Sequence, residues 1–213
     1  MVKAILFDFW GTLVENGTYS PLRQTFNILR VRMPFSLFVV KLESTLMTKK
    51  FEDQASAFTE VCRAFNIDPH PVLIDRLIGV WNKNKLLAKL YPETIAVLED
   101  LKKEKYKMAL VSNCPSGSVE PVIEKFDLAK YFDAIILSWE IGKLKTDKDF
   151  FEEALKKLKI KKKEDVIMVG DSIPTDIEGA RNAGLRAILI DRKETREHPD
   201  KICNLTELKP LLK

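Results

Sequence analysis

The stretch "ILFDFWGTL", residues 5–13, ends an apolar run in a single acid, Asp8, and continues into a Gly-Thr pair. A short and continuous apolar run is typical of a strand buried on both faces of a parallel sheet. Two positions after Asp8, where a second carboxylate would complete a nucleophile and acid pair, the chain has Trp10. The segment therefore predicts a buried strand that ends at one carboxylate, beside an indole that cannot exchange protons.

Four further segments have the same apolar character. They are "KMALVS" (107–112), "AIILS" (134–138), "VIMVG" (166–170) and "RAILI" (186–190). Helical patterns lie between them, such as "TIAVLEDLKKE", "SVEPVIEKF" and "DFFEEALKKLK". Strands that alternate with helices at this pitch predict an α/β fold with a doubly wound parallel sheet. Ligands of such sheets bind beyond the carboxyl ends of the strands.

Residues 15 to 88 interrupt this alternation with apolar residues at helical spacing. The four groups are Leu22, Phe26 and Leu29; Phe38, Leu42 and Leu46; Ala55, Phe58, Cys62 and Phe65; and Leu77 with Trp81. Ser20 and Pro21 predict the N-cap and first turn of the first helix. We expect 15–88 to form a helical cap over the mouth of the first strand, inserted into a core made of 1–14 and 89–213.

The composition is that of a soluble globular protein, with 31% charged and 46% hydrophobic residues. A net charge of +4 over 213 residues gives no reason to expect a nucleic-acid or membrane partner. The three cysteines have neither zinc-site nor disulfide spacing. No window is apolar enough to span a membrane, and the N-terminus lacks the pattern of a secretory signal. We therefore expect a cytoplasmic protein.

Polar residues follow the predicted strands. Asp8 follows the first strand and Ser112-Asn113 ends the second. The segment after the third brings Lys145, and Asp171 follows the fourth with Asp176 five residues later. Each has an ordinary explanation alone, as a turn, a helix cap or a solvated lysine. Carboxyl ends of parallel strands share one edge, however, and this set matches the needs of phosphoryl transfer: a carboxylate nucleophile, donors for the phosphate oxygens and a divalent cation.

Four motifs occur in order along the chain. They are "DFWGT" (8–12), "VSN" (111–113), "GKLK" (142–145) and "GDSIPTDIEGARNAG" (170–184). On these motifs the chain resembles the haloacid dehalogenase superfamily over its whole length. The resemblance implies a Rossmann-like core with an α-helical cap inserted after the first motif.

The resemblance also implies a role for each residue. Asp8 would be the nucleophile that forms an aspartyl intermediate, and Asp176 would orient Lys145 or a metal-bound water. Mg²⁺ would be held by Asp8, Asp171 and the backbone carbonyl of Trp10, as suits a hard cation with oxygen ligands. The phosphate of a small-molecule substrate would be bound by Thr12, Ser112, Asn113 and Lys145.

Two departures from the family pattern bear on the reaction. Phosphatases of the family usually carry a second Asp where this chain has Trp10, and the loss of acid-base assistance costs about 10²–10⁴ in rate. The family's dehalogenases also lack this Asp, but those that resemble this chain need no metal and tend to lose the acid at Asp171, which is retained. The second departure is Thr146 in place of a common Pro, which leaves Lys143 as an alternative to Lys145.

We therefore expect a Mg²⁺-dependent phosphatase that hydrolyses small phosphate esters or acyl and aryl phosphates through an aspartyl phosphate on Asp8. The alternatives are a metal-independent 2-haloacid dehalogenase with an ester intermediate on Asp8, or a non-enzymatic protein that binds phosphate and Mg²⁺. Phosphonate chemistry would require a cap lysine, for which Lys41, Lys49 and Lys50 are candidates. The sequence indicates neither the substrate nor the oligomeric state.

Overall fold

The computed structural model of the chain describes residues 2–15 and 20–212. In this part of the chain six parallel strands form one sheet, in the order β3-β2-β1-β4-β5-β6. The strands are β1 (Ala4–Phe7), β2 (Lys107–Ser112), β3 (Ala134–Leu137), β4 (Val166–Gly170), β5 (Arg186–Ile190) and β6 (Lys201–Ile202). The predicted fold class and its five strands are confirmed, and β6 is an edge strand that the sequence analysis missed.

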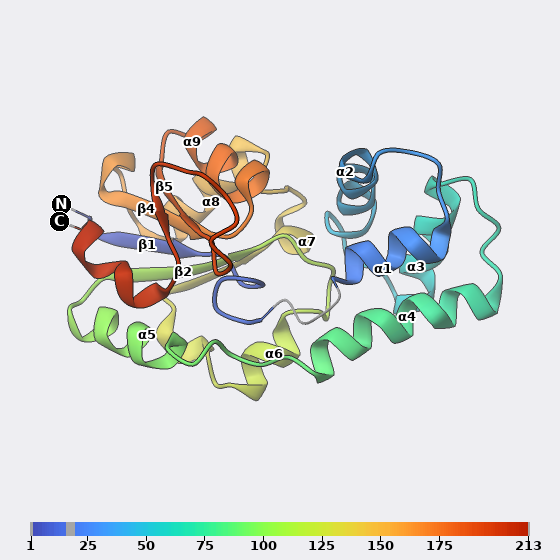
Figure 1. The fold of residues 1–213 in the computed structure, drawn as a ribbon, viewed down its shortest axis with the longest axis horizontal. Helices are drawn as coiled ribbons and strands as arrows, with labels where there is room; N and C mark the ends of the chain where they lie inside the picture. Colours follow the sequence, from blue (N-terminus) through green and yellow to red (C-terminus); the bar gives the residue numbers. More distant parts are fainter. Residues whose placement is uncertain (1, 16–19, 213) are drawn as a thin grey trace.

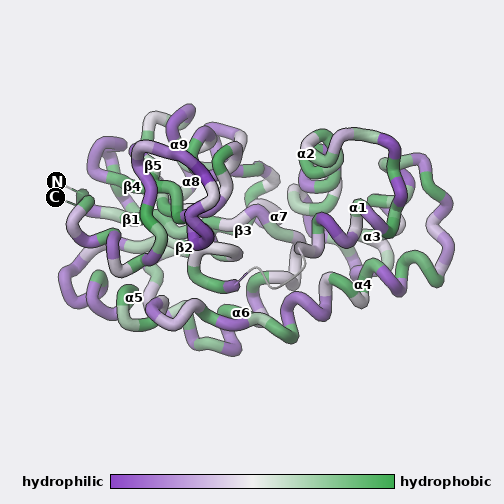
Figure 2. Tube along the Cα trace, in the orientation of Figure 1, coloured by the Kyte–Doolittle hydropathy of each residue, from purple (hydrophilic) through white to green (hydrophobic). Residues whose placement is uncertain are grey.

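Helices cover both faces of the sheet (Figure 1). One face carries α5 (Thr94–Lys103) and α6 (Glu120–Lys125), and the other carries α8 (Lys148–Leu158) and α9 (Gly179–Asn182). Residues of β1 alternate between the faces, since Ile5 and Phe7 pack with α5 and α6 while Leu6 packs with α8 and α9. This two-sided burial explains the continuous apolar runs, which Figure 2 shows as the hydrophobic interior of the core.

Short elements complete the core. They are α7 (Ser138–Ile141), the 3₁₀ turns Ala129–Tyr131, Lys163–Asp165, Leu205–Glu207 and Lys209–Leu212, and a π-helical turn at Ile173–Glu178. The two ends of the described chain lie together, because the backbone amide of Val2 donates to the carbonyl of Leu212. The carboxyl ends of the strands point the other way, toward four helices (Figure 1).

These four helices, here called the helical unit, lie between β1 and α5 in the chain. They are α1 (Pro21–Leu29), α2 (Phe35–Leu46), α3 (Gln54–Ala64) and α4 (Pro71–Leu86). The apolar groups predicted from helical spacing form a separate hydrophobic cluster around Phe38, Leu42 and Leu77, except for Ala55, which is exposed in the first turn of α3. Ser20 does precede α1, but its side chain makes no capping hydrogen bond. The limits 15–88 of the expected cap stay a prediction, and residues 16–19 lie outside the described residues.

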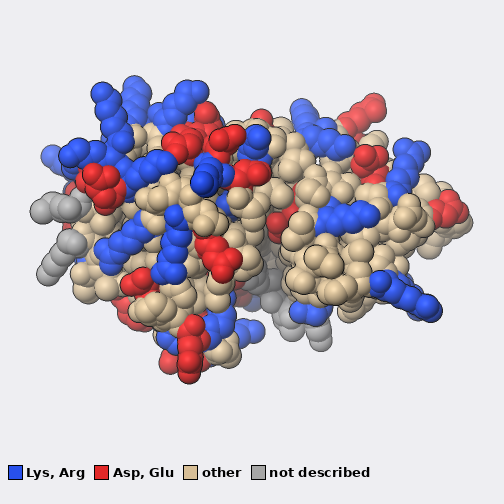
Figure 3. All heavy atoms as spheres, turned by 90° about the horizontal axis from the view of Figure 1, so that it is seen from above, with Lys and Arg blue, Asp and Glu red and all other residues tan. Residues whose placement is uncertain are grey.

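The surface carries charges of both signs. Figure 3 shows Lys and Arg interspersed with Asp and Glu over the core, and a broader area of other residues over the helical unit. Among the described helices, none combines the length and apolar character that a membrane span requires. On the face shown, charge of one sign does not dominate.

Candidate active site

Lys145 links two carboxylates at the carboxyl edge of the sheet. Its ammonium donates to Oδ1 of Asp8 and to Oδ1 of Asp176, the latter at 2.8 Å, and the lysine side chain is only 2% exposed. Burial lowers the pKa of Lys145, but Asp176 and Asp8 together raise it above its usual value. Lys145 is therefore a fixed positive charge. Lys143, the alternative, lies at the surface and pairs with Asp149 at 3.6 Å.

Asp8, Asp171 and Asp176 form a compact carboxylate cluster whose oxygen atoms can lie within 4.8 Å of one another. Burial raises the pKa of Asp8 to about 6, against the lowering effect of Lys145. Burial, followed by the charges of Asp8 and Asp176, raises the pKa of Asp171 to about 8. One lysine does not offset three acids, and a divalent cation would. The hard oxygen donors gathered here fit Mg²⁺.

Asp8 is held in place by the turn that follows β1. Its backbone amide donates to the carbonyl of Val169 at 2.9 Å, and the hydroxyl of Thr12 donates to its Oδ2 at 3.1 Å. Gly11 has a φ of 81°, the left-handed region that glycine adopts without strain. Thr12 was expected to bind phosphate, but in this structure it is fully buried and its hydroxyl contacts Asp8 instead.

The acids of the fourth motif are positioned by the π-helical turn Ile173–Glu178. The amide of Ile177 donates to the carbonyl of Ser172 five residues back, and the amide of Ser172 donates to Oδ2 of Asp176 at 3.0 Å. A Cβ atom on Gly170 would lie 2.2 Å from the same Oδ2. The wide turn and the missing side chain together bring Asp176 against the sheet edge, and π-turns are frequent at functional sites.

Asn113 connects the core to the helical unit. Its Oδ1 accepts from the backbone amide of Lys145 at 2.9 Å, and its Nδ2 donates to Oε2 of Glu43 on α2 at 3.2 Å. Ser112 is buried beside it at the end of β2. Burial raises the pKa of Glu43 to about 7, although the hydrogen bond from Asn113 and the charge of Lys145 lower it.

A cleft of about 520 Å³ lies between the sheet edge and the helical unit. The core contributes polar side chains that include Asp8, Ser112, Asn113, Lys145, Asp171 and Asp176. The helical unit contributes Glu43 and an apolar wall of Leu22, Phe35, Val39, Met47 and Trp81. Of the described residues that line the cleft, the lysines are Lys85, Lys145 and Lys193. The candidate lysines for phosphonate chemistry, Lys41, Lys49 and Lys50, therefore do not line the cleft that contains Asp8.

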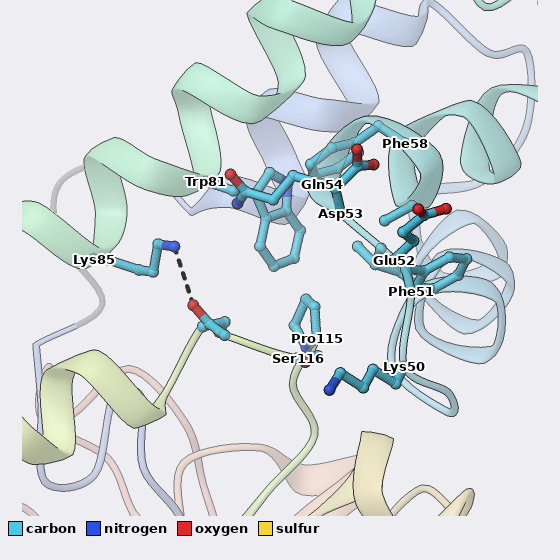
Figure 4. Close-up of a pocket in the computed structure, with 14 residues that line it drawn as sticks. Lys50, Phe51, Glu52, Asp53, Gln54, Phe58, Trp81, Lys85, Pro115 and Ser116 are labelled. Atoms are coloured by element: carbon cyan, nitrogen blue, oxygen red, sulfur yellow. Dashed lines mark hydrogen bonds between the residues drawn. The ribbon is translucent and has the colours of Figure 1, made fainter.

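A second cavity of about 190 Å³ adjoins this cleft (Figure 4). It lies between α3 and α4 of the helical unit and the core segment 115–118, and Trp81 and Lys85 line both spaces. Figure 4 shows the ammonium of Lys85 reaching across to the core, where it donates to the carbonyl of Gly117 at 3.0 Å. The cleft thus continues along α4 into a space with aromatic and cationic walls.

Trp10 forms part of the cleft wall. Its ring meets the ring of Phe9 edge to face, with centroids 5.2 Å apart and planes at 84°, and it packs against the hydrophobic core of the sheet. The indole therefore lines the core side of the cleft but provides no carboxylic acid that could donate a proton.

Sequence reasoning missed three charged residues. Glu43 reaches the cleft from α2, Arg192 donates to the carbonyl of Thr12 at 2.6 Å, and Arg196 donates to the carbonyl of Asp171. Both arginines lie in "DRKETR", the segment after β5, which has the composition of a solvated loop. The sequence around Glu43, "VVKLESTL", does not indicate that its side chain reaches the cleft. Which surface of α2 meets the core depends on tertiary packing. The position of "DRKETR" after a strand's carboxyl end is the signal that could have found the arginines.

Comparison with known proteins gives a consistent result. The family model of haloacid dehalogenase-like hydrolases matches residues 2–184. The chain is 28% identical to the glyceraldehyde 3-phosphate phosphatase of Methanothermobacter thermautotrophicus over 100% of both chains. Among solved structures, magnesium-bound YfnB of Bacillus subtilis has a TM-score of 0.67 at 17% identity, covering 99% of this chain and 98% of that one. A 2-haloacid dehalogenase of Pseudomonas syringae has a TM-score of 0.69 at 22% identity, covering 100% and 98%. At these identities the two structures bear on the fold alone.

Proposed function

The chain belongs to the haloacid dehalogenase-like hydrolases, and we propose that it is a Mg²⁺-dependent phosphatase acting on small phosphorylated molecules. The observation that carries this proposal is the cluster of Asp8, Asp171 and Asp176 around the buried ammonium of Lys145. The full-length similarity to a glyceraldehyde 3-phosphate phosphatase supports the same reaction class.

In this proposal Asp8 attacks the phosphorus atom and forms an aspartyl phosphate, which water then hydrolyses. Lys145, Ser112 and the backbone amide of Asn113 would hold the phosphate oxygens. Lys145 remains charged beside Asp8 and Asp176, so it neutralises both the nucleophile and the incoming phosphate. Thr12 would keep Oδ2 of Asp8 oriented, which leaves Lys145 on Oδ1.

Mg²⁺ would be held by Asp8, Asp171 and the backbone carbonyl of Trp10, and it would supply positive charge for the transferred phosphate. Asp176 would act indirectly, by holding Lys145. The carbonyl of Trp10 can serve as well as that of an aspartate at the same position, so the indole does not disturb this ligand set.

The dehalogenase alternative is less well supported by the electrostatics. A metal-free reaction on Asp8 would have to tolerate Asp171 beside it, and burial together with neighbouring carboxylates already opposes the ionisation of Asp171. A cation at this cluster removes that penalty. A protein that only binds phosphate would not need a nucleophile oriented by both Thr12 and Lys145.

We also propose that residues 15–88 act as the cap that selects the substrate. The wall that α1, α2 and α4 contribute is largely apolar, with Phe35, Val39 and Trp81 facing the phosphate-binding edge. Such a wall favours a small substrate whose leaving group carries apolar surface.

The test is hydrolysis of p-nitrophenyl phosphate and of 2-chloropropionate, each with Mg²⁺ and with excess EDTA. We expect phosphate release that requires Mg²⁺ and is lost in Asp8→Asn. Asp149→Asn is the matched control, since Asp149 is an exposed carboxylate whose partner is Lys143. Chloride release that EDTA does not affect would establish the dehalogenase instead, and binding of Mg²⁺ and phosphate without turnover of either compound would favour the binding protein.

A further inference from the structure

Glu43 is a carboxyl group at the cleft that forms no salt bridge with any residue the structure describes. Among the described residues its one hydrogen-bonding partner is Asn113, whose amide donates to Oε2 at 3.2 Å. Its side chain lines the same cleft as Asp8 and Lys145, and it reaches that cleft from α2 of the helical unit. A partly buried carboxyl without a salt bridge is costly for folding, so a structural role explains it poorly.

Among the described residues, position 10 offers no proton donor where phosphatases of the family usually carry an acid. The leaving oxygen of an alkyl phosphate departs as an alkoxide unless it receives a proton, and Trp10 has none to give. Lys145 cannot substitute, because two carboxylates hold its proton. Asp171 and Asp176 belong to the carboxylate cluster around the proposed cation. Glu43 is the remaining carboxyl group among the described residues that line the cleft.

We propose, building on the phosphatase reaction above, that Glu43 is the general acid and base of this enzyme, supplied by the helical unit in place of the position occupied by Trp10. In the first step Oδ of Asp8 bonds to phosphorus, the bond from phosphorus to the leaving oxygen breaks, and that oxygen takes the electron pair and the proton of the Glu43 carboxyl. In the second step water bonds to phosphorus and gives a proton to the Glu43 carboxylate, and the bond from phosphorus to Asp8 breaks.

Asn113 gives this arrangement a defined geometry. It joins the backbone amide of Lys145 to the carboxyl of Glu43, so the acid is in register with the phosphate-binding edge only when the helical unit lies against the core. The placement of the acid therefore depends on this contact between the helical unit and the core.

Burial is the main influence on the protonation of Glu43. It raises the pKa of Glu43 to about 7, while the hydrogen bond from Asn113 and the charge of Lys145 lower it and the charges of Asp176 and Asp8 raise it. The other charged groups lining the cleft are Lys85 of α4, Lys193 of the segment after β5, and Asp171. A general acid works best when its pKa lies near the working pH.

The experiment compares Glu43→Gln with the wild-type enzyme on p-nitrophenyl phosphate, phenyl phosphate and an alkyl phosphate, all with saturating Mg²⁺. Gln keeps the shape of Glu43 and can still accept from Asn113, but it holds no acidic proton. We expect kcat/KM to fall by about 10²-fold or more for the alkyl and phenyl esters. For p-nitrophenyl phosphate, whose leaving group needs no proton, kcat/KM should change less than about threefold.

Two further readouts separate acid-base action from positioning. Loss of the base should make hydrolysis of the aspartyl phosphate limiting, so Glu43→Gln should release p-nitrophenolate in a burst of one equivalent per enzyme. In the wild-type enzyme kcat/KM for phenyl phosphate should fall above pH 7 as Glu43 ionises, and this fall should vanish in Glu43→Gln. Glu43→Asp should recover part of the activity on phenyl phosphate. Glu60→Gln is the control, since Glu60 is an exposed acid of the same unit that pairs with Lys49.

The outcomes are distinct. Equal losses of kcat/KM for all three esters in Glu43→Gln, with an unchanged pH profile, would make Glu43 a positioning residue and overturn the inference. A wild-type enzyme that releases no phosphate with Mg²⁺, or an Asp8→Asn variant that keeps full activity, would instead overturn the proposed phosphatase function itself.

Discussion

The Cβ atom that Gly179 lacks would lie 2.1 Å from the backbone carbonyl oxygen of Lys145. Backbone atoms cannot move aside as the end of a flexible side chain can, so the segment carrying Lys145 would have to shift. Because Lys145 contacts both Asp8 and Asp176, a displacement of its backbone reaches the proposed nucleophile, Asp8, directly. The first turn of α9 is thus packed against Lys145 with no room for a methyl group.

We therefore predict that Gly179→Ala lowers kcat by about 10²-fold, because a misplacement of about 1 Å at a reacting group has that effect. Gly79→Ala is the matched control: Gly79 lies inside α4 with nothing within 4 Å of an added Cβ. That change should leave kcat unaltered and stabilise the helix by about 0.5–1 kcal/mol. Steady-state kinetics and thermal denaturation of the two variants check both expectations, and equal kinetics would contradict the first.

Asp171 should make the metal-free protein less stable as the pH rises. In the folded chain burial and the charges of Asp8 and Asp176 raise its pKa from 3.8 to about 8, so between these values the folded state holds a proton that the unfolded chain has released. Stability therefore falls as the pH increases through this range. Without metal, Asp171→Asn should raise the Tm at pH 8 by at least about 2–4 °C, which corresponds to about 1 kcal/mol at this chain length.

Mg²⁺ should reverse the order of stability of the wild-type protein and Asp171→Asn at pH 8. Binding to the folded state alone stabilises it by about 2.7 kcal/mol at a hundred times the Kd. Mg²⁺ should then raise the Tm of the wild-type protein and have little effect on Asp171→Asn. Calorimetry at pH 5 and pH 8, with Mg²⁺ and with EDTA, tests both parts. A variant that is less stable than the wild type without metal at pH 8 would mean that another group relieves the charge of Asp171.

Arg192 ties the turn after β1 to the rest of the core. It donates to the carbonyl of Thr12 at 2.6 Å, pairs with Glu93 and lies over the ring of Tyr91, 3.7 Å from its centroid. Burial would raise the pKa of Glu93, but Arg192 holds it below its usual value. Arg192→Met leaves two polar partners in a mostly buried site and should cost about 1–3 kcal/mol at pH 7.

That penalty has a predictable pH dependence. A lowered carboxyl pKa stabilises the fold above the pKa of the unfolded chain, and this contribution disappears as the pH falls through the lowered value. The difference between the wild-type protein and Arg192→Met should therefore shrink below pH 4.5, the ordinary pKa of Glu93. Denaturant titrations at pH 7 and pH 4 measure it. Arg186→Met is the control, because Arg186 is exposed and its hydrogen bond among the described residues is to the carbonyl of Leu211.

Most of the fold was predictable because strands buried on both faces have continuous apolar sequences. The four residues of β1 are all fully buried, and five strands were found, with β3 predicted one residue too long at its carboxyl end. β6 escaped because Lys201 and Ile202 are too few to show a pattern. The convergence of Asp8, Lys145 and Asp176 followed from parallel topology alone, since each lies beyond the carboxyl end of a strand.

Contacts between the core and the helical unit were beyond sequence reasoning. Periodicity identifies Phe38, Leu42 and Leu46 as the interior of α2, but it leaves Glu43 on the helix surface without saying whether that surface meets solvent or the cleft. The hydrogen bond from Asn113 to Glu43 depends on how the helical unit packs against the core. Thr12 illustrates the same limit at shorter range: whether its hydroxyl faces Asp8 or the substrate depends on the rotamer within the turn.

A carboxyl placed at position 10 should restore proton transfer in an enzyme that lacks Glu43. Trp10 lines the cleft next to Asp8, and its ring is held by an edge contact with Phe9. In the Glu43→Gln background we predict that Trp10→Asp raises kcat/KM for phenyl phosphate by at least about tenfold, while Trp10→Asn does not, since only the acid can donate a proton. Asn and Asp have nearly the same volume. Comparing the two double variants therefore removes the effect of the space that the indole leaves. Equal rates for the two double variants would show that position 10 is out of reach of the leaving oxygen, and the indole would then serve only as a wall of the cleft.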